Sequence, residues 1–208
     1  MHDDPRDGGG LPYDEATLDY YEKFAPTYSA SGAGGESRHL ASFLDRLAPS
    51  SRILELGCGG GIDASAMIAR GFVVDAVEGA PTIAKLAEKR LRCPVKVMRF
   101  DQLEATAEYD AVWASASLIH IPRQALCDAL ARIFAALKPS GLHFASYKSG
   151  GHEGRDSVGR YYNYPSGEEL QGFYRQSAPW QIMNFVEYVG GGYPNGSGPW
   201  AAIIARRP

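Results

Sequence analysis

Two acidic residues around a run of glycines carry the clearest chemical signal in the chain. Glu55 precedes the glycine-rich segment Gly57–Gly61, which contains Cys58, and Glu78 follows 23 residues after Glu55. Glycines permit a tight turn and let a ligand approach the backbone closely. An acidic residue at about the spacing of Glu78 can accept hydrogen bonds from both hydroxyls of a ribose. The pattern predicts a site for a nucleotide-type cofactor.

Two kinds of cofactor fit this loop. Gly59, Gly61 and Ala64 satisfy a permissive G-x-G-x-x-A fingerprint, which is typical of nicotinamide dinucleotide sites. Glu55 argues against that cofactor, because a carboxylate at the mouth of the loop would repel a pyrophosphate. The same carboxylate suits the ammonium and sulfonium groups of S-adenosyl-L-methionine (SAM). Charge therefore favours SAM.

Three segments, ILELGCGGG, VDAVEGAP and RFDQL, resemble motifs I, II and III of the class I SAM-dependent methyltransferases. The resemblance extends from about Asp19 to the C-terminus. It implies a doubly wound, Rossmann-like α/β fold, with a seven-stranded, mostly parallel sheet, an antiparallel last strand and helices on both faces. It also implies methyl transfer from SAM to an oxygen or nitrogen atom of a small molecule. An NAD-dependent oxidoreductase and a non-catalytic SAM-binding module stay open as alternatives.

The resemblance also implies which residues hold SAM. Glu78 would take the ribose hydroxyls, although Asp is also frequent at this position, and Asp101 would accept a hydrogen bond from the adenine amino group. The other implied cofactor residues are Glu55, Gly57, Cys58 and Gly59 at the methionine end, Gly79 and Ala80 beside the ribose, Phe100 and Gln102 beside the adenine, and Ala114 and Ser115 as the floor.

His120 is the candidate catalytic residue. It lies in SASLIHIPR, just past the expected fourth strand, and ligands of open α/β sheets bind at the carboxyl ends of the strands. An imidazole has the right unperturbed pKa to accept a proton from an oxygen or nitrogen nucleophile. A capping or packing role in the loop is the alternative.

The segment after the expected fifth strand is the candidate acceptor loop. Lys148, Arg160, Tyr161 and Tyr164 mix cations with aromatic hydroxyls, a combination that can recognise a small anionic or aromatic acceptor. The alternative is a solvated surface loop stabilised by tyrosines.

Tyrosines near the N-terminus resemble the amino-terminal lid of many small-molecule methyltransferases. In such a lid a tyrosine packs near the methyl donor and excludes water. Tyr28 is expected beside the cofactor, and Tyr21 on the acceptor side. An ordinary helix with an aromatic packing face is the alternative.

Alternating strand and helix patterns position these residues. Periodicity predicts strands at residues 52–56, 72–78, 94–100, 111–116 and 142–147, and helices at 62–70, 81–91 and 123–137, which is typical of a parallel sheet. A helix at 168–176 and an antiparallel pair of strands at 180–189 and 200–205 follow. Helices at 13–24 and 36–47, joined by a flexible segment at 31–35, precede the first strand.

Composition limits the partners. With 208 residues, 45% hydrophobic and 22% charged, the chain is expected to form a flexible tail at residues 1–12 and a single domain at 13–208, whose helical lid is residues 13–48. A net charge of -3 argues against nucleic acid as a partner.

Cys58, Cys93 and Cys127 are too scattered for a zinc site or a disulfide framework, so no metal is expected. Without a signal or membrane-spanning pattern, we expect a cytoplasmic monomer or homodimer with a small-molecule acceptor and no membrane partner.

Overall fold

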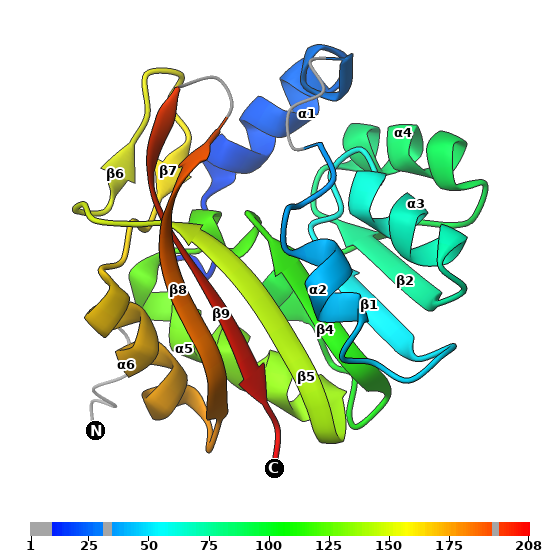
Figure 1. Ribbon diagram of the computed structural model, residues 1–208. Helices are drawn as coiled ribbons and strands as arrows, with labels where there is room; N and C mark the ends of the chain where they lie inside the picture. Colours follow the sequence, from blue (N-terminus) through cyan, green and yellow to red (C-terminus); the bar gives the residue numbers. More distant parts are fainter. Residues whose placement is uncertain (1–9, 31–34, 193–195) are drawn as a thin grey trace, which may run out of the picture.

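The computed structural model describes residues 10–30, 35–192 and 196–208, so most of the expected tail and of the flexible segment at 31–35 lies outside the described residues. Figure 1 shows one sheet with helices on both sides. The helices are α1 (Glu15–Ala30), α2 (Leu40–Leu44), α3 (Ile62–Ala69), α4 (Pro81–Leu91), α5 (Arg123–Ala136) and α6 (Gly167–Ser177), with short 3-10 turns η1 (Phe100–Gln102) and η2 (Leu118–His120). The strands are β1 (Arg52–Leu56), β2 (Val73–Glu78), β3 (Lys96–Val97), β4 (Tyr109–Ser115), β5 (Leu137–Lys148), β6 (Gly154–Arg155), β7 (Tyr161–Tyr162), β8 (Gln181–Gly191) and β9 (Ser197–Arg206).

The main sheet confirms the expected fold class. Its seven strands run in the order β3-β2-β1-β4-β5-β9-β8. β1 pairs in parallel with both β2 and β4, whereas β9 is antiparallel to both β5 and β8. The strand order reverses direction between β1 and β4, and open α/β sheets bind ligands at such a switch point, outside the carboxyl ends of the strands.

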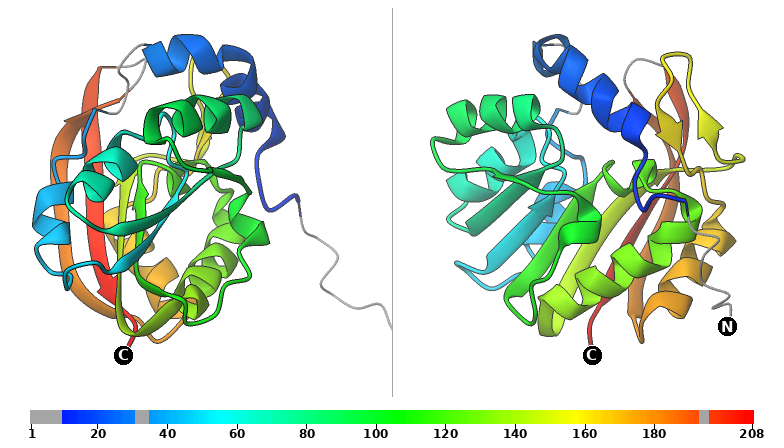
Figure 2. Two further views of the ribbon diagram at one scale, coloured as in Figure 1. Left: turned by 90° about the vertical axis from the view of Figure 1, so that its right-hand side faces the viewer. Right: turned by 180° about the vertical axis from the view of Figure 1, so that it is seen from behind.

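Alternating side chains bury both faces of the sheet. On one face Trp113 stacks on Phe144, with ring centroids 4.0 Å apart, and α2 packs over them with Phe43. On the other face Leu54 and Val112 lie in the larger core cluster, which α5 and α6 cover. The views in Figures 1 and 2 show the helices divided between the two faces in this way. No helix within the described ranges is long and apolar enough to cross a membrane.

The structure departs from the expected elements in several places. β3 keeps only two residues of the expected strand at 94–100, because η1 turns the chain directly after it. α1 runs on to Ala30 through Pro26, with a kink at Phe24, since a proline interrupts the hydrogen-bond ladder of a helix without having to end it. α2 is shorter than the expected helix at 36–47. A two-stranded hairpin, β6–β7, stands where only loop was expected.

A buried histidine in β5 makes stability depend on pH. His143 is fully buried, one ring nitrogen lies 3.1 Å from the Val112 carbonyl, and burial lowers its pKa from 6.5 to about 4. Above pH 6.5 the ring is neutral in the folded and unfolded chains alike. As pH falls from 6.5 towards 4, the unfolded chain takes up the proton first, so His143 destabilises the fold in this window.

We expect the His143→Phe variant to lose this part of the pH dependence. Between pH 7 and pH 4 the free energy of unfolding of the wild type should fall by up to about 3 kcal/mol more than that of the variant. Urea unfolding of both proteins across this range measures the difference, in which the contributions of the other titrating groups cancel. Parallel curves would contradict the neutral, buried state of His143.

Candidate cofactor and acceptor site

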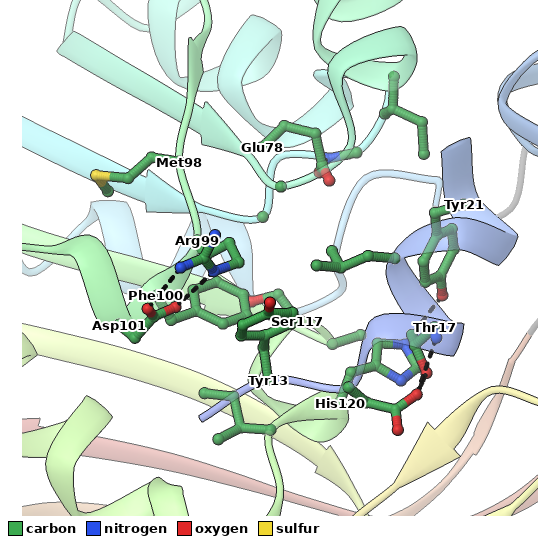
Figure 3. Close-up of a pocket in the computed structure, with 18 of the residues that line it drawn as sticks. Tyr13, Thr17, Tyr21, Glu78, Met98, Arg99, Phe100, Asp101, Ser117 and His120 are labelled. Carbon is green, nitrogen blue, oxygen red and sulfur yellow. Dashed lines mark hydrogen bonds and ion pairs between the residues drawn. The ribbon is translucent and has the colours of Figure 1, made fainter. Parts of the chain in front are cut away.

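One pocket lies at the carboxyl ends of β1, β2 and β4, beneath α1. Its volume, counted together with the open solvent at its mouth, is about 760 Å³. Figure 3 shows side chains from α1 and from the strand ends pointing into it. Among the predicted residues, those that line it are Tyr21, Tyr28, Gly57, Gly59, Glu78, Gly79, Phe100, Asp101 and His120. Lining residues that the sequence analysis did not name are Pro12, Tyr13, Asp14, Thr17, Leu18, Ile83, Met98, Arg99, Ala116, Ser117 and Ile121.

The glycine loop presents bare backbone to the pocket. Gly57 has φ +72°, which favours glycine, and a Cβ built there would lie 2.6 Å from the Cβ of Ser117. Gly59 has φ +52°, and the ring of Tyr28 lies 3.7 Å from the place of its absent Cβ. The loop and the Tyr28 ring therefore form adjoining parts of the same wall.

Glu78 ends β2 with its carboxylate held in place by the backbone. The amide of Gly59 donates to one carboxylate oxygen at 2.9 Å, and the amide of Ala80 donates to the other at 3.1 Å. Burial raises the pKa of Glu78 despite these hydrogen bonds. A carboxylate has about four lone pairs, more than the backbone amides of Gly59, Gly79 and Ala80 occupy, so it can still accept from a ligand. Ala80 itself is buried behind Glu78 and does not line the pocket.

Glu55 and Cys58 lie beneath the loop and do not line the pocket. Glu55 is 4% exposed, and its Oε2 atom has no hydrogen-bond partner among the described residues. Burial, together with the nearby carboxylates of Asp63 and Glu78, raises its pKa well above the usual value. Burial also raises the pKa of the Cys58 thiol, which is therefore a neutral packing group. Contact between these two residues and a cofactor stays a prediction.

Asp101 enters the pocket together with a partner that the sequence analysis missed. Both of its carboxylate oxygens accept from the Arg99 guanidinium, at 3.0 and 2.9 Å. The guanidinium carbon lies 4.3 Å from the ring centroid of Tyr13, and Phe100 lines the pocket beside it. Gln102 instead accepts from the backbone amide of Arg99 and does not line the pocket. The available sequence signal for Arg99 was a basic residue two positions before Asp101.

The chain at the end of β4 contributes residues two positions later than predicted. Ala114 is buried in the core and Ser115 ends the strand, and neither lines the pocket. Ala116 and Ser117 line it instead. The side chain of Ser117 is buried, and its hydroxyl has no hydrogen-bond partner in the part of the chain that the structure describes.

His120 lies in the pocket wall, held on both ring nitrogens. Nε2 lies 3.0 Å from the Tyr21 hydroxyl, and Nδ1 lies 2.6 Å from the Tyr161 carbonyl. Burial lowers its pKa to about 4, so the ring is neutral at physiological pH. The structure thus brings the predicted catalytic residue together with Tyr21, a predicted acceptor residue.

The other predicted acceptor residues lie behind the pocket wall. Arg160 is 1% exposed, pairs with Asp156 at 2.8 Å and donates to the Tyr21 hydroxyl at 2.8 Å. The Lys148 ammonium lies 4.4 Å from the ring centroid of Tyr162, on which the ring of Tyr164 also stacks. None of the predicted residues Lys148, Arg160, Tyr161 and Tyr164 lines the pocket, so their contact with an acceptor stays a prediction.

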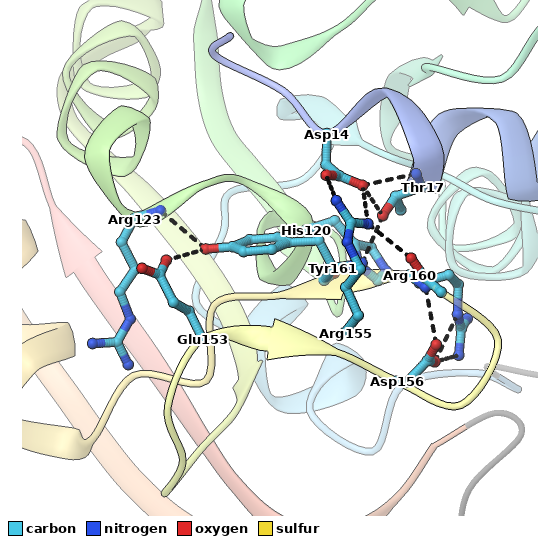
Figure 4. Close-up of polar contacts among 10 residues, drawn as sticks. Asp14, Thr17, His120, Arg123, Glu153, Arg155, Asp156, Arg160 and Tyr161 are labelled. Atoms are coloured by element: carbon cyan, nitrogen blue, oxygen red, sulfur yellow. Dashed lines mark hydrogen bonds and ion pairs between the residues drawn. The ribbon is translucent and has the colours of Figure 1, made fainter. Parts of the chain in front are cut away.

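Three contacts hold α1 and the residue directly before it in place over the pocket. Figure 4 shows Arg155 of the β6–β7 hairpin reaching Asp14, an ion pair of 2.6 Å, and the amide of Tyr161 donates to the Thr17 hydroxyl at 2.8 Å. Further along α1, Glu22 accepts from the amide of Thr82 at the start of α4, at 2.8 Å. α1 therefore bridges the glycine-loop half of the pocket and the hairpin half.

Comparison with known sequences places a family match on the central part of the chain. Residues 53–141 match the model of a methyltransferase domain. The ubiquinone biosynthesis O-methyltransferase of Xanthomonas campestris pv. campestris is 35% identical over an alignment of 108 residues that covers 47% of this chain and 43% of that protein. The protein of the same name from Xylella fastidiosa is 33% identical over 104 residues, 46% of this chain and 41% of its own. The match thus spans less than half the length of these curated relatives.

Solved structures share the fold over most of the chain. The 1,6-didemethyltoxoflavin-N1-methyltransferase of Burkholderia thailandensis, solved with 1,6-didemethyltoxoflavin and S-adenosylhomocysteine bound, has a TM-score of 0.75 at 22% identity and covers 99% of this chain and 93% of its own. A SAM-dependent methyltransferase of Methanosarcina mazei has a TM-score of 0.72 at 16% identity, and the match covers 80% of this chain and 96% of that protein. A [4+2]-cyclase has a TM-score of 0.73 at 17% identity, and the match covers 96% of this chain and 99% of the cyclase. At these identities the likeness establishes the fold alone.

Proposed function

We propose that the protein transfers the methyl group of SAM to an oxygen or nitrogen atom of a small molecule, since residues 53–141 match a methyltransferase domain. One observation carries the proposal: the glycine-loop backbone, Glu78, Asp101 and His120 all line the same pocket. Methyl transfer from a sulfonium is an in-line displacement, so holding donor and acceptor side by side supplies most of what the reaction needs.

The lining residues fit SAM. A side chain at Gly57 would collide with Ser117, so only glycine lets the loop backbone and Ser117 lie next to each other in the pocket wall. Glu78 and Asp101 supply acceptors for ribose hydroxyls and for an adenine amino group. Carboxylates in the lining favour a ligand with a positive sulfonium over a pyrophosphate. When bound, SAM supplies an electrophilic methyl group.

The acceptor we propose is a small molecule with an aromatic or flat apolar part. The rings of Tyr13, Tyr21, Tyr28 and Phe100 and the side chain of Ile121 line the pocket, and aromatic walls pack well against flat ligands. α1 lies over this space and serves, in our proposal, as a lid that keeps water from the methyl donor. Both oxygen and nitrogen stay possible target atoms, because the relatives include an O-methyltransferase and an N1-methyltransferase.

The proposal is tested by incubating the protein with SAM labelled with tritium in its methyl group and with a deproteinised small-molecule extract of bacterial cells. We expect label in low-molecular-mass products that separate from SAM. Tight binding of SAM without any labelled product would favour the non-catalytic SAM-binding module instead.

A further inference from the structure

We infer that the Tyr21 hydroxyl, backed by His120, is the group that takes the acceptor's proton, and that the methylated atom of the acceptor therefore carries an O–H or N–H hydrogen. This inference rests on the proposed function and names the substrate class for that site. Tyr21 and His120 both line the pocket, from α1 and from η2 respectively. Figure 3 shows the two side chains side by side at the pocket wall.

The tautomer of His120 follows from its neighbours. The Tyr161 carbonyl, 2.6 Å from Nδ1, can only accept a hydrogen bond, so Nδ1 carries the hydrogen. In the neutral ring the lone pair is then on Nε2, which accepts from the Tyr21 hydroxyl at 3.0 Å. Asn163 holds η2 in place, because its backbone amide donates to the Ile119 carbonyl at 2.9 Å and its side-chain amide donates to the Leu118 carbonyl at 2.9 Å.

Counting lone pairs shows which atom meets the acceptor. Nε2 of His120 has one lone pair, and Tyr21 occupies it. The Tyr21 oxygen has two lone pairs, of which one accepts from Arg160 at 2.8 Å. The second lone pair can accept a hydrogen bond from a molecule in the pocket. The acceptor's proton therefore meets Tyr21 first, and His120 acts through Tyr21.

The pKa shifts of Tyr21 and His120 favour a proton relay through a neutral Tyr21 over a Tyr21 that is already deprotonated. Burial raises the pKa of Tyr21 well above its usual value, so its side chain stays a neutral hydroxyl that must pass its own proton on. Burial lowers the pKa of His120 to about 4; Arg160 and Lys148 add to the lowering, whereas Asp156 and the hydrogen bond with Tyr161 oppose it. So weak a base suffices because an O–H or N–H group becomes strongly acidic as its heavy atom gains the methyl group.

The proposed step balances in atoms and electrons. The bond from the acceptor oxygen or nitrogen to the methyl carbon forms as the carbon–sulfur bond of SAM breaks and leaves its electron pair on sulfur. Tyr21 takes the acceptor's proton on its oxygen and gives its own proton to Nε2 of His120. His120 ends as an imidazolium and later releases the proton to solvent. A nucleophile without a hydrogen, such as a carboxylate or a thioether, would not need this arrangement.

The first test needs no acceptor. We would record ¹⁵N NMR spectra of protein labelled at histidine nitrogens, saturated with S-adenosylhomocysteine, for the wild type, Tyr21→Phe and, as a matched control outside the pocket, Tyr188→Phe. We expect the His120 hydrogen on Nδ1 in the wild type, and a shift of the Nε2 resonance in Tyr21→Phe alone. A hydrogen on Nε2, or an unchanged Nε2 resonance in Tyr21→Phe, would overturn the inference.

The second test measures label transfer in the extract assay at saturating SAM. We expect Tyr21→Phe and His120→Ala each to lower the rate of label transfer by about 100-fold or more, and the double variant to be no slower than the slower single variant, because the two groups act as a unit. The main labelled products should carry the methyl group on oxygen or nitrogen. An unchanged rate of label transfer in Tyr21→Phe would contradict the inference while leaving methyl transfer standing. No product from the wild type would overturn the proposed function and, with it, the relay.

Discussion

The Gly57→Ala variant will bind SAM with an affinity about 100-fold or more below that of the wild type. This is the largest effect that we expect from a single added methyl group. The new Cβ would lie 2.6 Å from the Cβ of Ser117 and 3.5 Å from the ring of Phe100, and both of these residues line the pocket. The φ of +72° adds backbone strain, which costs about 1 to 3 kcal/mol of stability. Calorimetric titration with SAM, together with thermal unfolding, measures both effects.

Gly71 provides the matched control. Its φ is +86°, so Gly71→Ala carries similar backbone strain, yet nothing lies within 4 Å of the place of its Cβ. Gly71 connects α3 to β2 and does not line the pocket. We expect Gly71→Ala to lower stability and to leave the SAM affinity within about twofold. Equal losses of affinity in both variants would mean that loop strain, rather than pocket shape, controls binding.

The Glu78→Gln variant will also weaken SAM binding by about 100-fold, since hydrogen bonds to a charged acceptor contribute about 1.5 to 3 kcal/mol each. The carboxylate accepts from the amides of Gly59 and Ala80 at once. A glutamine has only one acceptor atom, so its amide nitrogen would face one of these two donors. The binding constants of SAM and S-adenosylhomocysteine should fall together, because the ribose is common to both.

Glu88→Gln is the control for this substitution. Glu88 accepts from the backbone amide of Val95 at 3.1 Å, near the far end of α4, and does not line the pocket. We expect its SAM affinity to stay within about twofold of the wild type. A Glu78→Gln variant that bound SAM as tightly as Glu88→Gln would remove Glu78 from the cofactor site.

The regular part of the fold could be predicted because its signals are local. Pro81 opens α4, where a proline costs no hydrogen bond, and Lys89 lies in its last turn, so the predicted helix at residues 81–91 has the observed bounds. Glycine and acid spacing likewise placed Gly57, Gly59 and Glu78 at one pocket. Periodicity within a window of about a dozen residues contains this information.

The missed features depend on contacts between distant segments. The β6–β7 strands have two residues each, too short for a periodic pattern. Arg155 of this hairpin forms an ion pair with Asp14, 141 residues away. The two partners of the Arg160 guanidinium, Asp156 and Tyr21, were also missed, whereas its contact with an acceptor stays a prediction. No local pattern shows whether a cation faces a ligand or a buried carboxylate.

Calorimetric titration with SAM, S-adenosylhomocysteine and NAD, on the wild type and on Asp101→Ala, tests the central claim most directly. We predict saturable binding of both sulfur nucleosides, no binding of NAD, and weaker binding of both nucleosides to Asp101→Ala. Preference for NAD, or no binding of SAM to the wild type, would contradict the account.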